Sequence, residues 1–202
     1  LIGIIAYYTF TFTQNRYLLF LGLGYIWIGL LDFAHTLTFP NMNLFDTNDV
    51  NITLSIWTLT RVFEALILLT ALLVRNKHFN SLIITIFFMI ISISICFFAI
   101  KSPLLLFIDE SGLTALKNGL EYLAIAILTV TFILNKINYK FFNKRIYQGI
   151  QIAIIFTILA ELSFTTYVIW DGTPAVVGHV FKFISFWLVF QSIIITAFIK
   201  PM

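Results

Sequence analysis

Residues 79–100 read FNSLIITIFFMIISISICFFAI, an apolar stretch without a charged side chain. A helix needs about 20 such residues to cross the hydrocarbon core of a bilayer, so the stretch predicts a membrane-spanning helix. The whole chain has the same character: its 202 residues are 60% hydrophobic and 10% charged, with a mean hydropathy of +1.01. A soluble domain could not hide that much apolar surface, because its exterior must face water. The composition therefore predicts an integral membrane protein with the lipid bilayer as its partner.

Seven apolar segments follow one another along the chain, separated by connections that contain Pro, Gly and Asn. The expected fold class is an all-α integral membrane bundle of about seven transmembrane helices. The expected spans are residues 1–13, 17–39, 52–74, 79–100, 113–134, 146–170 and 175–199. Because the chain opens and closes in apolar stretches, we expect residues 1–202 to be a single transmembrane domain, cut from a longer protein, with a truncated first helix.

Basic residues alternate from one connection to the next. Eight Lys or Arg residues fall in the connections on one side of the expected bundle, and only Lys101 falls clearly on the other side. Lys and Arg accumulate in cytoplasmic loops, so we expect the amino end outside and the carboxyl end in the cytoplasm. The basic set is Arg16, Arg75, Lys77, Lys136, Lys140, Lys144, Arg145 and Lys200.

The cysteine count and the net charge exclude an internal disulfide and argue against a nucleic-acid-binding protein. The single cysteine, Cys96, lies in an apolar run, so the chain cannot form an internal disulfide. The formal net charge of +3 is too small to suggest a nucleic-acid partner.

Eight charged or titratable side chains fall inside the expected spans, where a charge costs about 2.5–3.5 kcal/mol on insertion scales. The set is Asp32, His35, Arg61, Glu64, Glu121, Glu161, His179 and Lys182. All are expected in the outer half of the bundle or near its midplane. Three pairs have i,i+3 spacing, which places both members on one face of a helix: Asp32 with His35, Arg61 with Glu64, and His179 with Lys182.

Two interpretations of this set stay open from the residues alone. In the first, the groups pair off as internal ion pairs, Arg61 with Glu64 or Glu161, and Lys182 with Asp32 or Glu121. In the second, they line a pocket that opens to the outside, where a ligand, an ion or a cofactor completes the charge balance.

The two histidines of the set have several possible roles. His35 and His179, with Asp32 or Glu161, are candidate ligands of a divalent metal. The histidines could also be axial ligands of a haem. Alternatively, they are neutral hydrogen-bonding residues or a pair that responds to protons.

Five elements of the chain resemble the third type of the membrane-associated sensor domains, the MASE group. They are residues 20–36 (FLGLGYIWIGLLDFAHT), 57–64 (WTLTRVFE), 112–117 (GLTALK) followed by Glu121 and Tyr122, 160–167 (AELSFTTY) and 178–185 (GHVFKFIS). They stand in the family's order and span nearly the whole chain. The resemblance marks the same eight residues that depth and spacing single out.

The resemblance implies a non-catalytic sensory input domain in the prokaryotic cytoplasmic membrane. It implies a cytoplasmic output region in the same polypeptide, a histidine kinase or diguanylate cyclase, and a homodimer. We expect a small ligand or ion to bind in an outward-facing charged pocket, and the last helix to carry the signal. Alternatives left open are a metal- or haem-binding intramembrane protein, a carrier that uses the same charges, and a retinal protein with Lys182 as the Schiff base.

Overall fold

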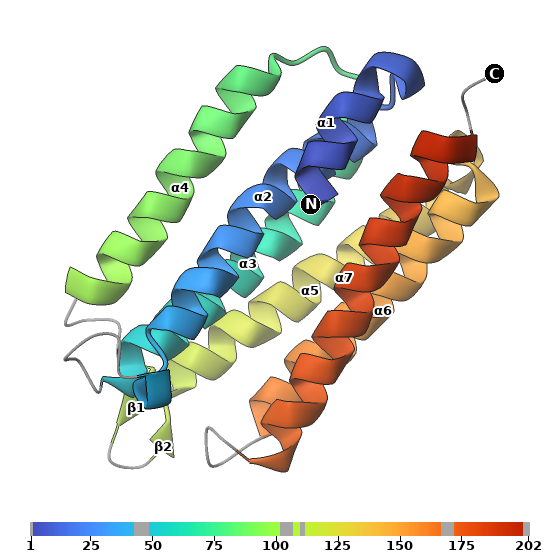
Figure 1. Cartoon of the computed structure of the whole chain (residues 1–202). Helices are drawn as coiled ribbons and strands as arrows, with labels where there is room; N and C mark the ends of the chain where they lie inside the picture. Colours follow the sequence, from blue (N-terminus) through green and yellow to red (C-terminus); the bar gives the residue numbers. More distant parts are fainter. Residues whose placement is uncertain (1, 43–48, 102–106, 110–111, 167–171, 200–202) are drawn as a thin grey trace.

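The computed structural model describes residues 2–42, 49–101, 107–109, 112–166 and 172–199. These residues form a bundle of α-helices with one short β-hairpin and two 3₁₀ turns (Figure 1). The elements in chain order are α1 (Ile2–Thr13), α2 (Arg16–Leu37), η1 (Pro40–Met42), α3 (Val50–Val74), α4 (Ser81–Lys101), β1 (Ile108–Asp109), β2 (Gly112–Leu113), α5 (Ala115–Ile137), η2 (Tyr139–Phe141), α6 (Lys144–Thr166) and α7 (Thr173–Ile199).

The helices agree with the segments expected from hydropathy to within a few residues. Six of the described helices, α2 to α7, are long and apolar enough to cross a membrane, whereas α1 has 12 residues and is too short. The all-helical class is thus confirmed with six helices able to cross a membrane, whereas the expected count of about seven spans stays a prediction. The expected end of the sixth span, at residue 170, lies outside the described residues.

Polar caps set where several helices begin. The side chain of Asn15 accepts a hydrogen bond from the backbone N–H of Leu18 at 3.1 Å, and the side chain of Asp49 accepts one from Asn51 at 2.9 Å. Such caps satisfy backbone donors that have no partner inside the helix. Thr114 caps α5 in the same way, so α5 begins at Ala115 and not at residue 113, where hydropathy placed its start.

The hairpin before α5 was not predicted from the sequence. Ile108 pairs with Leu113, and Asp109 pairs with Gly112, in an antiparallel ladder. Gly112 has a φ of 111°, a backbone conformation that side chains with a Cβ rarely adopt. The short polar stretch around it gives no alternating pattern, so hydropathy alone predicted only a loop.

The bundle has two chemically different ends. At the basic end α3 and α5 finish. There, Nη2 of Arg75 donates to Oδ1 of Asn138 at 2.9 Å, and Nη2 of Arg16 lies 2.7 Å from Nδ1 of His78. The opposite end, called the hairpin end, contains η1, β1, β2 and the starts of α3, α5 and α7 (Figure 1). The expected basic residues that the structure describes lie in the connections at the basic end or in the helix turns next to them.

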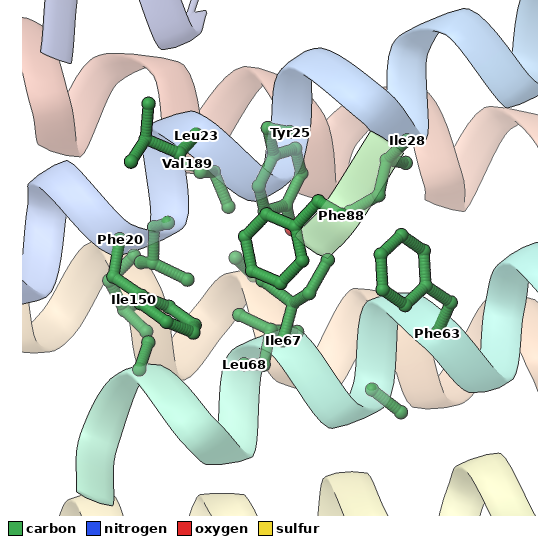
Figure 2. Packing of buried hydrophobic residues seen from close by; sticks show 14 of the residues in the cluster. Phe20, Leu23, Tyr25, Ile28, Phe63, Ile67, Leu68, Phe88, Ile150 and Val189 are labelled. Carbon is green, nitrogen blue, oxygen red and sulfur yellow. The ribbon is translucent and has the colours of Figure 1, made fainter. Parts of the chain in front are cut away.

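The apolar core holds α2, α3 and α4 together (Figure 2). The ring of Phe88 on α4 packs edge-on against Phe20 of α2 and Phe63 of α3, at centroid distances of 5.3 and 5.6 Å. Most other side chains of α4 point outward, among them Phe87 and Phe98. A helix that is apolar all round suits a lipid environment, because its outer face meets acyl chains and not water.

Gly22 allows α1 to lie close against α2. A Cβ added at Gly22 would stand 2.2 Å from the Cβ of Ala6, whereas one added at Gly29, on the same helix, meets nothing within 4 Å. Helices can approach closely where their contact residues are small.

Gly22→Ala is therefore expected to lower stability by about 1–3 kcal/mol, because α1 must move off α2. Gly29→Ala is the matched control and should be neutral or slightly stabilising. Thermal unfolding of both variants in detergent measures the difference, and equal melting temperatures would contradict the packing of α1 on α2.

Candidate functional site

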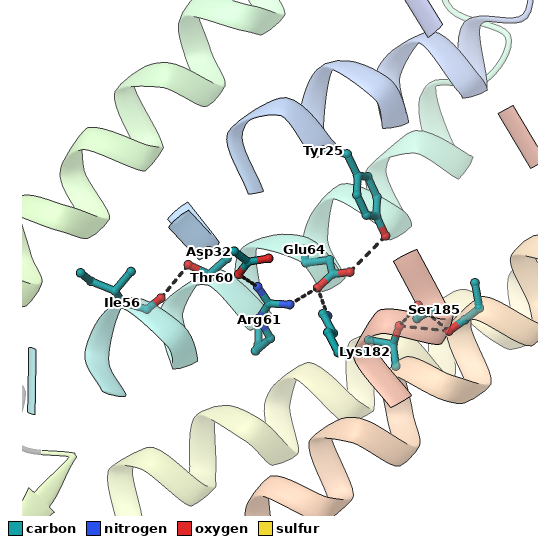
Figure 3. A network of polar contacts seen from close by, with 10 residues as sticks. Tyr25, Asp32, Ile56, Thr60, Arg61, Glu64, Lys182 and Ser185 are labelled. Atoms are coloured by element: carbon teal, nitrogen blue, oxygen red, sulfur yellow. Dashed lines mark hydrogen bonds and ion pairs between the residues drawn. The ribbon is translucent and has the colours of Figure 1, made fainter. Parts of the chain in front are cut away.

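A buried carboxylate, Glu64 of α3, joins three helices (Figure 3). Its Oε2 accepts a hydrogen bond from Nη1 of Arg61 at 2.9 Å and also pairs with the ammonium of Lys182 on α7. Its Oε1 accepts a hydrogen bond from the hydroxyl of Tyr25 on α2 at 3.0 Å. Both cations are buried, so each charge in this cluster is held by another and not by water.

Arg61 extends the cluster to a second carboxylate. Its Nη2 pairs with Asp32 of α2, and its guanidinium lies 4.4 Å from the ring centroid of Trp57, in the range of a cation–π contact. Arg61 and Glu64 lie on one face of α3, as their i,i+3 spacing predicts. Lys182, expected to pair with Asp32 or Glu121, instead pairs with Glu64.

A pocket of about 410 Å³ lies between α2 and α7, with α3 behind it. Four of the eight predicted residues line it, two from each of these helices. Arg61 and Glu64 lie deeper and hold two of the lining side chains in place. The lining residues are Asp32, His35, Thr36, Phe39, Met42, Trp57, His179, Lys182 and Phe183.

Trp57 connects the two histidines of the pocket. Its ring centroid lies 4.9 Å from that of His35 and 4.9 Å from that of His179. Nδ1 of His35 lies 2.9 Å from the backbone oxygen of Thr53, which fixes the orientation of this imidazole. Trp57 was not among the site residues expected from the sequence, since a tryptophan in a span carries no signal of its own.

His179 has a neighbouring contact that depends on a glycine. The ring of Phe164 on α6 lies 5.3 Å from the imidazole of His179 and 5.0 Å from the indole of Trp57. A Cβ added at Gly178 would come within 2.5 Å of the Phe164 ring. The absence of a side chain at residue 178 thus lets α6 and α7 approach at the depth of the pocket.

The candidate metal ligands do not assemble into a metal site. Among the described residues, no group of three or more His, Cys, Asp or Glu side chains is placed to hold a metal ion. His35, His179, Asp32 and Glu161 are all described, so this finding covers the whole candidate set. Structural and catalytic zinc sites need at least three protein ligands, which this arrangement does not supply.

Glu121 belongs to a second ion pair that the sequence analysis did not propose. Lys117 lies one turn before it on α5, and its Nζ is 2.8 Å from the Glu121 carboxylate. Lys117 also donates to the backbone oxygen of Phe164 on α6 at 2.6 Å. The i,i+4 spacing was the available signal, but Lys117 was taken only as part of a family element near the outer end of the span.

Glu161 differs from the other three carboxylates. It is fully buried on α6, and neither of its oxygens has a hydrogen-bond partner in the described structure. Its strongest attractive interactions are with Lys182 and Arg61, but those cations already pair with Glu64 and Asp32. With Lys117 added, the buried charged residues are three carboxylates and three cations, and Asp32 is a fourth, partly exposed carboxylate.

Two substitutions separate the paired carboxylate from the unpaired one. Glu64→Gln is expected to lower the free energy of unfolding by about 3 kcal/mol, because it leaves buried Lys182 without its counter-charge. Glu161→Gln should change it by less than about 1 kcal/mol, since no donor loses a partner. Reversible unfolding in mixed detergent measures both values, and a larger loss for Glu161→Gln would contradict the assigned pairing.

Comparison with known proteins gives one match. The model of the MASE3 family, described as a membrane-associated sensor domain, matches residues 1–201. No curated protein and no solved structure matches the chain. The match covers the elements that position the pocket and the buried charges. The chain therefore belongs to the MASE3 family and is a membrane-associated sensor domain, a multi-pass inner-membrane protein.

Proposed function

We propose that this domain is a non-catalytic sensory input module whose ligand binds in the pocket between α2 and α7. One observation carries the proposal: the same side chains that line the pocket also belong to the buried charge cluster. Asp32 and Lys182 face the pocket, and each is held from behind by a residue of α3. A molecule between α2 and α7 therefore acts on groups that fix how these helices sit against α3.

The basic end is proposed to face the cytoplasm, because Lys and Arg accumulate in cytoplasmic loops. The pocket then lies in the outer half of the domain, and α7 runs from the pocket toward the cytoplasm. We propose that α7 continues the signal into an output region of the same polypeptide, a histidine kinase or diguanylate cyclase. Two copies of the chain would pair as a homodimer, so that a movement of α7 changes the geometry of the paired output regions.

The helices α6 and α7 are suited to move as one unit. The hydroxyls of Thr157 and Ser185 lie 2.7 Å apart, and Ser185 also donates to the backbone oxygen of Ala153 at 2.9 Å. In contrast, the Lys182–Glu64 pair is a polar link between α7 and α3. A shift of α7 would thus carry α6 with it and would act on this ion pair as well as on the contact of α7 with α1.

Signalling requires two arrangements that bind the ligand with different affinity, since a ligand with equal affinity for both changes nothing. In the described arrangement Lys182 is bound to Glu64, so an ion pair links α7 to α3. The proposed second arrangement has a different separation of α2 and α7 around the ligand. Helix shifts of about 1–2 Å are a common form of such transitions.

Lys182→Met tests this role of α7. The variant keeps an apolar stem but removes the charge that docks α7 on α3, so the full-length protein should lose its ligand-dependent output. Spin labels at Lys77 and Gln191, in a Cys96→Ser background, report the distance between the ends of α3 and α7. We expect this distance to change by about 1–2 Å.

Lys140→Met is the matched control, because Lys140 lies at the basic end and outside the charge cluster. It should leave both the distance and the output unchanged. If Lys182→Met also left both unchanged, α7 would not transmit the signal and the proposal would fail.

A further inference from the structure

The pocket between α2 and α7 is open on its side. Phe183 lines the pocket, yet 72% of its surface is exposed, and Thr36 on the opposite wall is exposed as well. Phe183 lies ten residues into α7, roughly 15 Å from the start of the helix at 1.5 Å per residue. That depth falls within a hydrocarbon core of about 30 Å. With α7 placed across a bilayer, the opening beside Phe183 would face lipid, where a compound dissolved in the bilayer could reach it.

The side chains that line the pocket favour a ligand with a flat ring. Trp57, Phe39 and Phe183 line the pocket together with the imidazoles of His35 and His179. Aromatic side chains pack favourably against other rings in offset or edge-on geometry. The volume of about 410 Å³ lies in the range of small-molecule sites, about 300–1,000 Å³.

The charges of the pocket favour a neutral ligand. Asp32 is paired with Arg61, and Lys182 is paired with Glu64. Each lining charge thus already has a counter-charge from α3. An added ion would have to leave water without gaining a free partner, which is costly in a buried site.

The tautomer of His35 predicts that the ligand carries a hydrogen-bond donor. The backbone oxygen of Thr53 can only accept, so Nδ1 of His35 carries the hydrogen that it donates at 2.9 Å. In the neutral ring Nε2 is then an acceptor and needs a donor from the ligand. His179 makes no hydrogen bond with the described residues, and its ring can serve a second polar group.

From these features we infer that the ligand is a lipid-soluble ring compound with a hydroxyl group, the chemical class of phenols and reduced quinones. It enters from the bilayer beside Phe183, and its hydroxyl donates to Nε2 of His35. The inference rests on the proposed ligand site between α2 and α7. It goes beyond that site in naming the ligand class, the entry route and the contacting atom.

The test uses the full chain in lipid nanodiscs and two probes of the same shape. The phenol 2,3,5-trimethylphenol has the hydroxyl donor, and its methyl ether, 2,3,5-trimethylanisole, does not. Binding is followed by tryptophan fluorescence and, independently, by the shift in melting temperature. We expect the phenol to bind at least about tenfold more tightly, because a site built to hydrogen-bond a hydroxyl rejects an analogue without one.

Four variants test this preference and the side opening. His35→Ala should reduce it to less than about twofold, whereas His78→Ala, at the basic end, should leave it intact. Thr36→Trp fills the side opening without touching His35 and should weaken phenol binding. Leu30→Trp, at another exposed position of α2 that does not line the pocket, should leave phenol binding unchanged.

A charged phenol, 4-hydroxybenzenesulfonate, tests the entry route, because it stays in water and should not bind. Equal binding of phenol and ether would overturn the role of His35, and binding of the sulfonate would overturn entry from the bilayer. If no phenol bound while Lys182→Met still abolished the response of the output, the ligand class would be wrong and the sensory role of α7 would stand.

Discussion

The carboxylate of Glu64 is the group on which the arrangement of this bundle depends. It accepts from Tyr25 of α2 and binds Arg61 of α3 and Lys182 of α7 in a buried position. Uncompensated charges are costly at membrane depth and persist where they are paired or functional. Because one carboxylate serves three helices, a displacement of any of them breaks a contact that water cannot replace. Apolar packing against lipid could not fix the helices so specifically, since lipid chains are as apolar as the helices themselves.

The same ion pairs connect the pocket to the interior of the bundle. Asp32 and Lys182 are held from α3, so the wall of the pocket and the interior of the bundle share the same ion pairs. A ligand that contacts the lining residues acts on helix positions directly, without a separate relay. Glu161, buried on α6, has no hydrogen-bond partner in the described structure, whereas Lys117 and Glu121 form an ion pair of their own.

The sequence was sufficient for the bounds of the helices to within a few residues, because these follow from hydropathy and polar connections. The i,i+3 spacing correctly predicted that Arg61 and Glu64 share a face of α3. Partners on different helices were not predictable in this way. Lys182 of α7, a helix that packs mainly on α6 and α1, reaches Glu64 of α3 through its long side chain, and spacing within one helix holds no information about that. The position of Trp57 between the histidine rings and the hairpin around Gly112 depend on tertiary packing and loop geometry for the same reason.

The most direct test of this account is a double-mutant cycle on the ion pair between α3 and α7. The free energy of unfolding is measured in mixed detergent for the original chain, Glu64→Gln, Lys182→Met and the double variant. Residues in direct contact show coupling of about 0.5–3 kcal/mol, and we expect at least about 1 kcal/mol for this pair. A parallel cycle with Glu161→Gln in place of Glu64→Gln should give a smaller value. Additive effects of Glu64→Gln and Lys182→Met would mean that the pair does not dock α7 on α3, and would contradict the account.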